Sequence, residues 1–165
     1  LGYALTATGN DVTLEDIARI ADVFYIGGTK VGAMFGEAVV FTHGNMPKNF
    51  VTLVKQHGAL LAKGWLLGVQ FDTLFTDDLY CGIARHANDA ADRIREVLVE
   101  RGYTLTFDAP TNQIFITLDN ATSERLQRNV RLGFMEKADD THTVMRICTS
   151  WATTPEEVDQ LIELL

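Results

Sequence analysis

The sequence predicts an α/β chain whose C-terminal part forms a smaller α+β unit. Short apolar runs near the N-terminus are typical of strands buried in a sheet, and segments with helical spacing alternate with them. From about Phe71 onward the pattern is helix, strand, helix, a pair of strands and a final helix. Of the 165 residues, 47% are hydrophobic, which is enough to bury a sizeable core.

The first helix and the first strands follow from capping residues and apolar runs. Thr13, followed three positions later by Asp16, predicts the start of a short helix that ends near Ala21. The apolar run Val23–Ile26 predicts a strand that is buried on both faces. Residues 38–41 predict a second strand of the same kind.

Two helical regions are predicted in the middle of the chain. Pro47 suits the first turn of a mostly helical region that extends to about Tyr80, and its glycines interrupt the pattern and allow one or two bends. The segment between residues 60 and 71 is apolar on nearly all sides, which is typical of a buried helix. The second helix, Ile83–Arg101, has regular apolar spacing, and Gly102 is its expected end.

The last third of the chain changes period. Gln113–Leu118 predicts a strong strand, and Asn120 is expected to cap a helix that ends at Gly133. Residues 134–137 and 143–148 predict two strands joined by a turn.

A capping box predicts the terminal helix. Thr154 and Glu157 have the required spacing, and Pro155 stands at the first helical position. The chain is therefore expected to divide into residues 1–70 and residues 71–165, the second part being the small α+β domain.

Composition and spacing argue against several function classes. The chain carries 14 basic and 22 acidic side chains, a net charge of −8, which disfavours a nucleic-acid or anionic-membrane surface. No apolar run reaches the roughly 18 residues that a membrane helix needs. Cys81 and Cys148 form no CxxC pair, and the histidines lack zinc-hydrolase spacing. We expect a soluble, cytoplasmic protein without a metal site.

A single lysine stands on a glycine-flanked turn between the two N-terminal strands. Gly27, Gly28 and Thr29 precede Lys30, and Gly32 follows it. A lysine amine forms a Schiff base with a carbonyl compound when its surroundings favour the neutral form. The turn is no phosphate-binding P-loop, because no Ser or Thr follows the lysine. Lys30 is therefore a candidate nucleophile, with a solvated surface lysine as the plainer alternative.

Two stretches resemble the low-specificity threonine aldolase and β-eliminating lyase family. Ala21–Lys30 (ADVFYIGGTK), continued by residues 32–40, is similar to the segment that carries the cofactor lysine in that family. Met145–Thr154 (MRICTSWATT) is similar to its last strand and the segment after it. The resemblance implies the aspartate-aminotransferase-like fold, fold type I, of pyridoxal-phosphate enzymes.

The resemblance implies roles for five residues. Lys30 would form the Schiff base with pyridoxal phosphate, Thr29 would offer its hydroxyl to the phosphate, and Gly28 would allow close approach of the main chain. Arg146 would bind the α-carboxylate of an amino-acid substrate through two parallel hydrogen bonds. Lys63 would reach the cofactor phosphate of a neighbouring subunit.

The resemblance also implies which part of such an enzyme the chain matches. Residues 1–70 would complete the large cofactor-binding domain, and residues 71–165 would form the small domain. The family's cofactor aspartate, phosphate-binding glycines and ring-stacking histidine come before the match to Leu1, so the chain would be the C-terminal half. The implied partners are an amino-acid substrate and identical subunits, as a homodimer or homotetramer.

The implied reaction is the cleavage of a β-hydroxy amino acid, such as threonine or allo-threonine, to glycine and an aldehyde. A β-eliminating lyase or an aminotransferase of the same fold remains an alternative. A fragment that self-associates without catalysis remains another.

Overall fold

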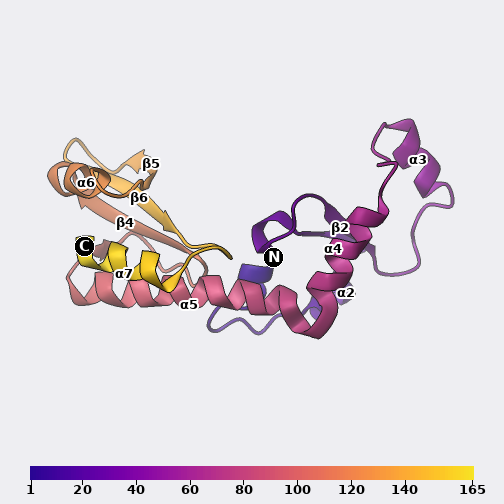
Figure 1. The fold of residues 1–165 in the computed structure, drawn as a ribbon, viewed down its shortest axis with the longest axis horizontal. Helices are drawn as coiled ribbons and strands as arrows, with labels where there is room; N and C mark the ends of the chain where they lie inside the picture. Colours follow the sequence, from indigo (N-terminus) through magenta and orange to yellow (C-terminus); the bar gives the residue numbers. More distant parts are fainter.

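The computed structural model describes residues 1–165, and Figure 1 shows them spread along one long helix, α5 (Leu79–Glu100). The N-terminal elements gather at one end of α5, and a four-stranded sheet with its helices lies over the other end (Figure 1). The remaining elements, in chain order, are α1 (Gly2–Leu5), α2 (Leu14–Ile20), β1 (Val23–Gly27), η1 (Thr29–Val31), β2 (Glu37–Phe41), α3 (Phe50–Gln56), α4 (Trp65–Phe75), η2 (Thr76–Asp78), β3 (Thr104–Leu105), β4 (Gln113–Asp119), α6 (Asn120–Gln127), β5 (Gly133–Lys137), β6 (His142–Cys148) and α7 (Pro155–Leu164).

The N-terminal elements pack around the start of α5. Strands β1 and β2 form an antiparallel pair. A cluster of buried side chains joins this pair to α4 and α5, and its members are Ile26, Val31, Leu74, Tyr80 and Ala84. Because Val31 belongs to η1, the cluster fixes the connection between the two strands against the helices.

The C-terminal elements build an antiparallel sheet with the strand order β3-β4-β6-β5. Ile114, Ile116 and Leu118 alternate along β4 and are almost completely buried in a core shared with α5, α6 and α7. The side chains between them face the opposite side of the sheet. Pairing of β4 with β6 places Arg146 opposite Phe115 on that second face.

Helix α5 contributes to both cores. Tyr80 and Ala84 belong to the N-terminal cluster, whereas Ala91, Ile94 and Leu98 belong to the C-terminal one. One helix therefore contributes side chains to both apolar clusters. The division of the chain at residue 71 stays a prediction.

Both predicted capping boxes are present. The Thr13 hydroxyl accepts a hydrogen bond from the Asp16 N–H at 3.1 Å, and the Asp16 carboxylate accepts one from the Thr13 N–H at 2.9 Å. Thr154 and Glu157 repeat this arrangement around Pro155 at the start of α7. These bonds satisfy N–H groups that a first helical turn leaves open, which explains why both helix starts are readable from sequence.

The helix after β4 differs from the prediction at both ends. Asp119, and not Asn120, is its N-cap, because the Asp119 carboxylate accepts a hydrogen bond from an N–H of the first turn at 2.9 Å. The Asn120 amide instead donates to the Asp140 carbonyl at 3.1 Å. α6 ends at Gln127, and Gly133 begins β5 instead of ending the helix.

The region from Pro47 to Tyr80 contains two separate helices, α3 and α4, rather than one helix with bends. α3 begins at Phe50, and residues 57–64 separate it from α4. Gly58 has a φ of +68°, a left-handed value that glycine adopts without a steric penalty. This glycine therefore ends α3 rather than bending a continuous helix.

Two segments that were expected to be buried are exposed. Tyr25 on β1 is 68% exposed, and Trp65 at the start of α4 is 65% exposed. The expected burial of both faces of β1, and of residues 60–71 on nearly all sides, is wrong for this chain, because no other element covers them. Further exposed apolar side chains of the second segment are Leu60, Leu61, Leu66 and Val69.

None of the helices combines the length and the apolar character that crossing a membrane would require. Cys81 and Cys148 are free thiols.

The turn between β5 and β6 carries a carboxylate whose ionised form is stabilised by folding. Asp139 accepts hydrogen bonds from the N–H and hydroxyl of Thr141 and from the N–H of His142, at 2.7 to 2.8 Å. These bonds, those from Thr141 foremost, hold the pKa of Asp139 well below its usual 3.8. Because the folded-state pKa is the lower one, the stabilisation is complete above about pH 4 and is lost as the pH falls further.

We expect Asp139→Asn to flatten the acid limb of the stability profile, because the amide does not titrate. The measurement is the free energy of unfolding from urea denaturation, between about pH 4 and pH 2. Asp140→Asn is the matched control, since the Asp140 carboxylate accepts no hydrogen bond within the chain and its loss should keep the wild-type slope. An unchanged slope in Asp139→Asn would contradict the assignment.

Candidate functional site

The connection between β1 and β2 presents Lys30 on the short 3₁₀ turn η1. Gly32 ends this turn with a φ of +96°, a left-handed value that favours glycine. Two tyrosines fasten the turn. The Tyr3 hydroxyl donates to the Lys30 carbonyl, and the Tyr80 hydroxyl donates to the Gly27 carbonyl at 3.2 Å. The predicted glycine-flanked lysine turn is therefore present, and its main chain is held on both sides of the lysine.

Gly28 is required for space rather than for conformation. Its φ of −101° and ψ of −29° are open to any residue. A Cβ at this position, however, would lie 2.7 Å from the Ala33 Cβ and 3.1 Å from the Phe71 Cζ. A Cβ at Gly27 would meet no atom within 4 Å. Gly28 thus allows close packing within the chain, and its closeness to a cofactor stays a prediction.

Replacing Gly28 by alanine should therefore cost stability. We expect a loss of about 1–3 kcal/mol in the free energy of unfolding, because the added methyl overpacks the contact with Ala33. Gly27→Ala is the matched control and should stay within about 0.5 kcal/mol of the wild type. Guanidinium denaturation measures both, and equal losses in the two variants would show that the contact is not the cause.

Arg146 projects from β6 on the face of the sheet away from the helices. Its Nη1 donates to the Gln113 Oε1 at 3.2 Å, and its Nε is buried without a hydrogen-bond partner. No carboxylate of the chain lies within 4 Å of the guanidinium. Since a guanidinium has five N–H donors, most of its hydrogen-bonding capacity is unused. Arg146 is thus a half-buried cation without a counterion in the chain.

The Lys30 turn and Arg146 meet at one cleft of about 370 Å³. Figure 1 shows the segment after β6 reaching toward the N-terminal elements, where this cleft lies. The residues that line it are Tyr3, Thr29, Lys30, Asn112, Gln113, Arg146, Cys148, Thr149, Ser150 and Trp151. A second cavity of about 190 Å³ adjoins the same turn and shares Tyr3, Thr29 and Lys30. The predicted residues Thr29, Lys30 and Arg146 are therefore brought together, although they lie far apart in the sequence.

Two positive charges act on the thiol of Cys148 in this cleft. Burial raises the pKa of Cys148, and the charges of Arg146 and Lys30 oppose that rise. Because Lys30 and Arg146 line the cleft and no aspartate or glutamate does, the cleft is electropositive. An anionic ligand suits this space.

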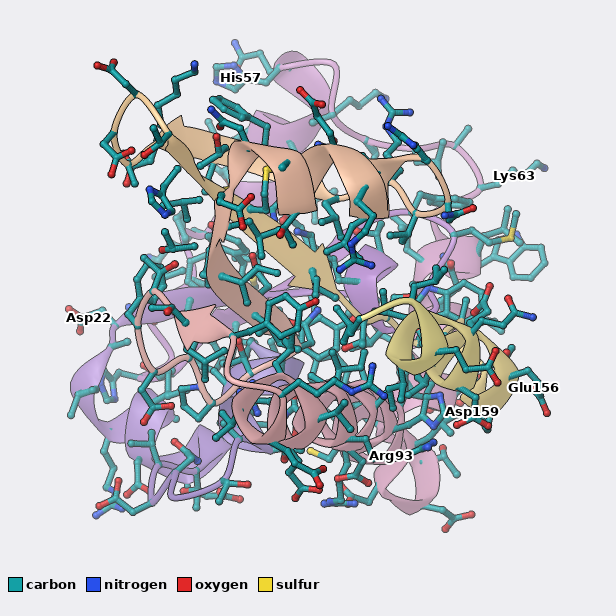
Figure 2. All side chains as sticks on the ribbon, turned by 90° about the vertical axis from the view of Figure 1, so that its left-hand side faces the viewer. Asp22, His57, Lys63, Arg93, Glu156 and Asp159 are labelled. Carbon is teal, nitrogen blue, oxygen red and sulfur yellow. The ribbon has the colours of Figure 1, made fainter.

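Two predicted site residues lie outside the lining of the cleft. Gly28 is buried against Ala33 and Phe71 and does not line the cleft. Lys63 is exposed in the segment before α4, and Figure 2 shows its side chain at the outer edge of the molecule, pointing away. Within one chain, Lys63 therefore makes no contribution to the cleft.

Several lining residues have no signal in the sequence. Tyr3 lies in a helix of four residues near the N-terminus, and its hydroxyl reaches the Lys30 main chain only in the folded state. Gln113 and Cys148 become neighbours through the register of β4 and β6. The segment after β6 is fastened to the start of β4 by the Asn112 amide, which donates to the Thr149 carbonyl at 2.7 Å. Strand pairing brings Gln113 and Cys148 together, whereas the contact of Tyr3 with the Lys30 turn depends on the packing of α1.

Similar proteins have been found by sequence. A low-specificity L-threonine aldolase of Pseudomonas aeruginosa (strain PAO1) is 30% identical over 141 residues, which are 85% of this chain and 40% of that protein. A low-specificity L-threonine aldolase of a Pseudomonas species (strain NCIMB 10558) is 30% identical over 107 residues, which are 64% of this chain and 31% of that protein. No family model matches the chain.

A solved structure decides the relationship. The threonine aldolase of Leishmania major superposes on 99% of this chain with a TM-score of 0.93 and 40% sequence identity. Over almost its whole length, the chain is similar to part of a threonine aldolase. It covers 48% of the Leishmania aldolase and less than half of each Pseudomonas aldolase, a share that agrees with the expected match to one half of such an enzyme.

Solved structures that are less similar to this chain confirm the fold class. The Sphingomonas wittichii serine palmitoyltransferase has a TM-score of 0.63 at 16% identity, over 99% of this chain and 44% of that chain. The 8-amino-7-oxononanoate synthase of Francisella tularensis has a TM-score of 0.53 at 15% identity, over 79% and 40%. At such identities the likeness concerns the fold alone, which is the predicted α/β fold type I.

Proposed function

We propose that the protein is a pyridoxal-phosphate-dependent lyase that cleaves β-hydroxy amino acids, such as threonine or allo-threonine, to glycine and an aldehyde. One observation carries the proposal: Lys30 and Arg146 line a single cleft in a chain that is 40% identical to a threonine aldolase. An amine suits a carbonyl cofactor, and a guanidinium suits the carboxylate of an amino acid. A serine palmitoyltransferase of the same fold carries pyridoxal phosphate in its solved structure, which supports this choice of cofactor.

The side chains of the cleft include an amine and a hydroxyl that could bind this cofactor. Lys30 is exposed to the cleft and would hold the cofactor through its Nζ. The Thr29 hydroxyl makes no hydrogen bond within the chain, so it would be free to donate to the phosphate, and the tight packing of Gly28 keeps the turn in place. When bound, pyridoxal phosphate supplies an electron sink for the pair released as the Cα–Cβ bond of the substrate breaks.

Arg146 would bind and orient the substrate. Its buried Nε has no partner in the chain, so the guanidinium keeps donors for a two-pronged bond to a carboxylate. No acidic side chain of the chain competes for it within 4 Å. A carboxylate held at Arg146 would fix the direction of the Cα–Cβ bond relative to Lys30 across the cleft.

We infer that the active protein is a cytoplasmic homodimer or homotetramer. The exposed apolar side chains at the start of α4, Trp65 among them, support self-association because so much apolar surface favours contact with another molecule. Lys63 precedes α4 and points outward (Figure 2), where it would meet the cofactor phosphate of a neighbouring subunit.

The test of the proposed function is the incubation of the whole protein with threonine. We expect glycine and acetaldehyde in equal amounts, dependent on added pyridoxal phosphate and measured by chromatography and a coupled reductase assay. Release of 2-oxobutanoate and ammonia would identify the β-eliminating alternative instead. Transfer of the amino group to a 2-oxo acid would identify an aminotransferase. A protein that takes up no pyridoxal phosphate would be the non-catalytic alternative.

A further inference from the structure

We propose that Gln113 is a positioning residue that holds the Arg146 guanidinium ready for the carboxylate of an amino-acid substrate. The inference rests on the proposed function, because it assigns a partner to the residue that would bind the substrate there. Gln113 lies at the start of β4 and lines the same cleft as Lys30 and Arg146.

Strand register brings the two side chains together. Gln113 pairs with Cys148 and Phe115 pairs with Arg146, so Gln113 and Arg146 are diagonal neighbours on one face of the sheet. The Arg146 Nη1 donates to the Gln113 Oε1 at 3.2 Å, and this is the one hydrogen bond that the Arg146 side chain makes within the chain. The opposite neighbour on β5 is Gly133, which has no side chain to hold the guanidinium. Gln113 is therefore the sole polar side chain that restrains Arg146.

An amide orients the guanidinium without neutralising it. Because arginine offers only donors, the amide oxygen of Gln113 must face Nη1, and its NH₂ group turns elsewhere. A carboxylate at this position would pair with the cation and occupy the site that a substrate carboxylate needs. Arg146 thus keeps its full charge and its unpartnered Nε while one of its nitrogens is fixed.

Fixing the side chain before binding has a thermodynamic benefit. A free arginine loses considerable rotamer freedom when it takes up a ligand, and a restrained one loses less. Removal of the Gln113 acceptor should therefore weaken the binding of carboxylate-bearing ligands. It should leave ligands without a carboxylate unaffected, which separates a positioning role from a general structural one.

The experiment compares glycine with methylamine, which has the amine but lacks the carboxylate. Each is titrated into the whole protein loaded with pyridoxal phosphate, and the change in the visible spectrum gives a dissociation constant. We expect Gln113→Met, which keeps the side-chain length and removes the acceptor, to raise the glycine constant about ten-fold and the methylamine constant less than two-fold. We expect Gln113→Glu to raise the glycine constant by about 100-fold, because the new carboxylate neutralises Arg146 and repels the ligand.

Thr117→Val provides the matched control. Thr117 lies on the same strand and the same face as Gln113 but outside the cleft, so its replacement should leave both constants unchanged. Equal weakening of glycine and methylamine by Gln113→Met would overturn the inference, and so would glycine binding that both Gln113 variants leave intact. If the unmodified protein responds to neither ligand, the proposed function fails, which is a different result from a failure of the Gln113 assignment.

Discussion

Replacing Lys30 by alanine should abolish threonine cleavage, with a loss of about 10³-fold or more in kcat. The amine of Lys30 is the one lysine nitrogen at the cleft that Arg146 also lines, so no other lysine of the chain can take its place there. The same change should remove the attachment point of the cofactor. Borohydride treatment of the loaded protein, followed by peptide mapping, should find a pyridoxyl group on the Lys30 peptide in the wild type and none in the variant.

Lys55→Ala is the matched control for this result. Lys55 is an exposed lysine in the last turn of α3, away from the cleft, and its loss should change neither activity nor labelling. A pyridoxyl group on another peptide, or wild-type activity in Lys30→Ala, would end the assignment of Lys30.

Replacing Arg146 by lysine should raise the KM for threonine by about 100-fold, which corresponds to about 3 kcal/mol of binding free energy. Lysine keeps the positive charge but cannot form the planar, two-pronged contact with a carboxylate. The variant should still carry the pyridoxyl label on Lys30 after borohydride treatment, because Arg146 is assigned to the substrate and not to the cofactor. Steady-state kinetics and peptide mapping measure the two effects separately.

The control for Arg146 is Arg128→Lys, because Arg128 is exposed just after α6 and lies outside the cleft. Its KM should equal that of the wild type. A KM for Arg146→Lys within about two-fold of the wild type would show that the substrate carboxylate binds elsewhere.

Local signals predicted the elements that depend on local contacts. The capping boxes at Thr13 and Thr154 concern bonds between residues three apart, so the sequence contains both partners. The end of α5 was readable for the same reason, since Gly102 takes the left-handed φ of +78° that favours glycine. Asp119 and Asn120 are both residue types that favour the N-cap position of a helix. Asp119 caps α6, whereas the Asn120 amide donates to the Asp140 carbonyl, a tertiary contact that the sequence does not reveal.

Burial was the least predictable property. Val23–Ile26 and residues 60–71 are apolar enough to be buried, yet Tyr25 and Trp65 are more than half exposed. An apolar pattern indicates which side chains would be stabilised by burial. It does not indicate whether another element or a partner covers them. That surface is a property of the arrangement of elements and of partners.

The sequence by itself determined the helix starts, the strand runs, the glycine-flanked presentation of Lys30 and a family resemblance that the Leishmania aldolase structure bears out. These depend on contacts within a few residues or on matched segments. Only the tertiary structure decided that Arg146 shares a cleft with Lys30 and that Gln113 restrains it. The physical reason is that such contacts arise from the register of β4 against β6 and from the packing of two cores along α5, neither of which any short stretch of residues encodes.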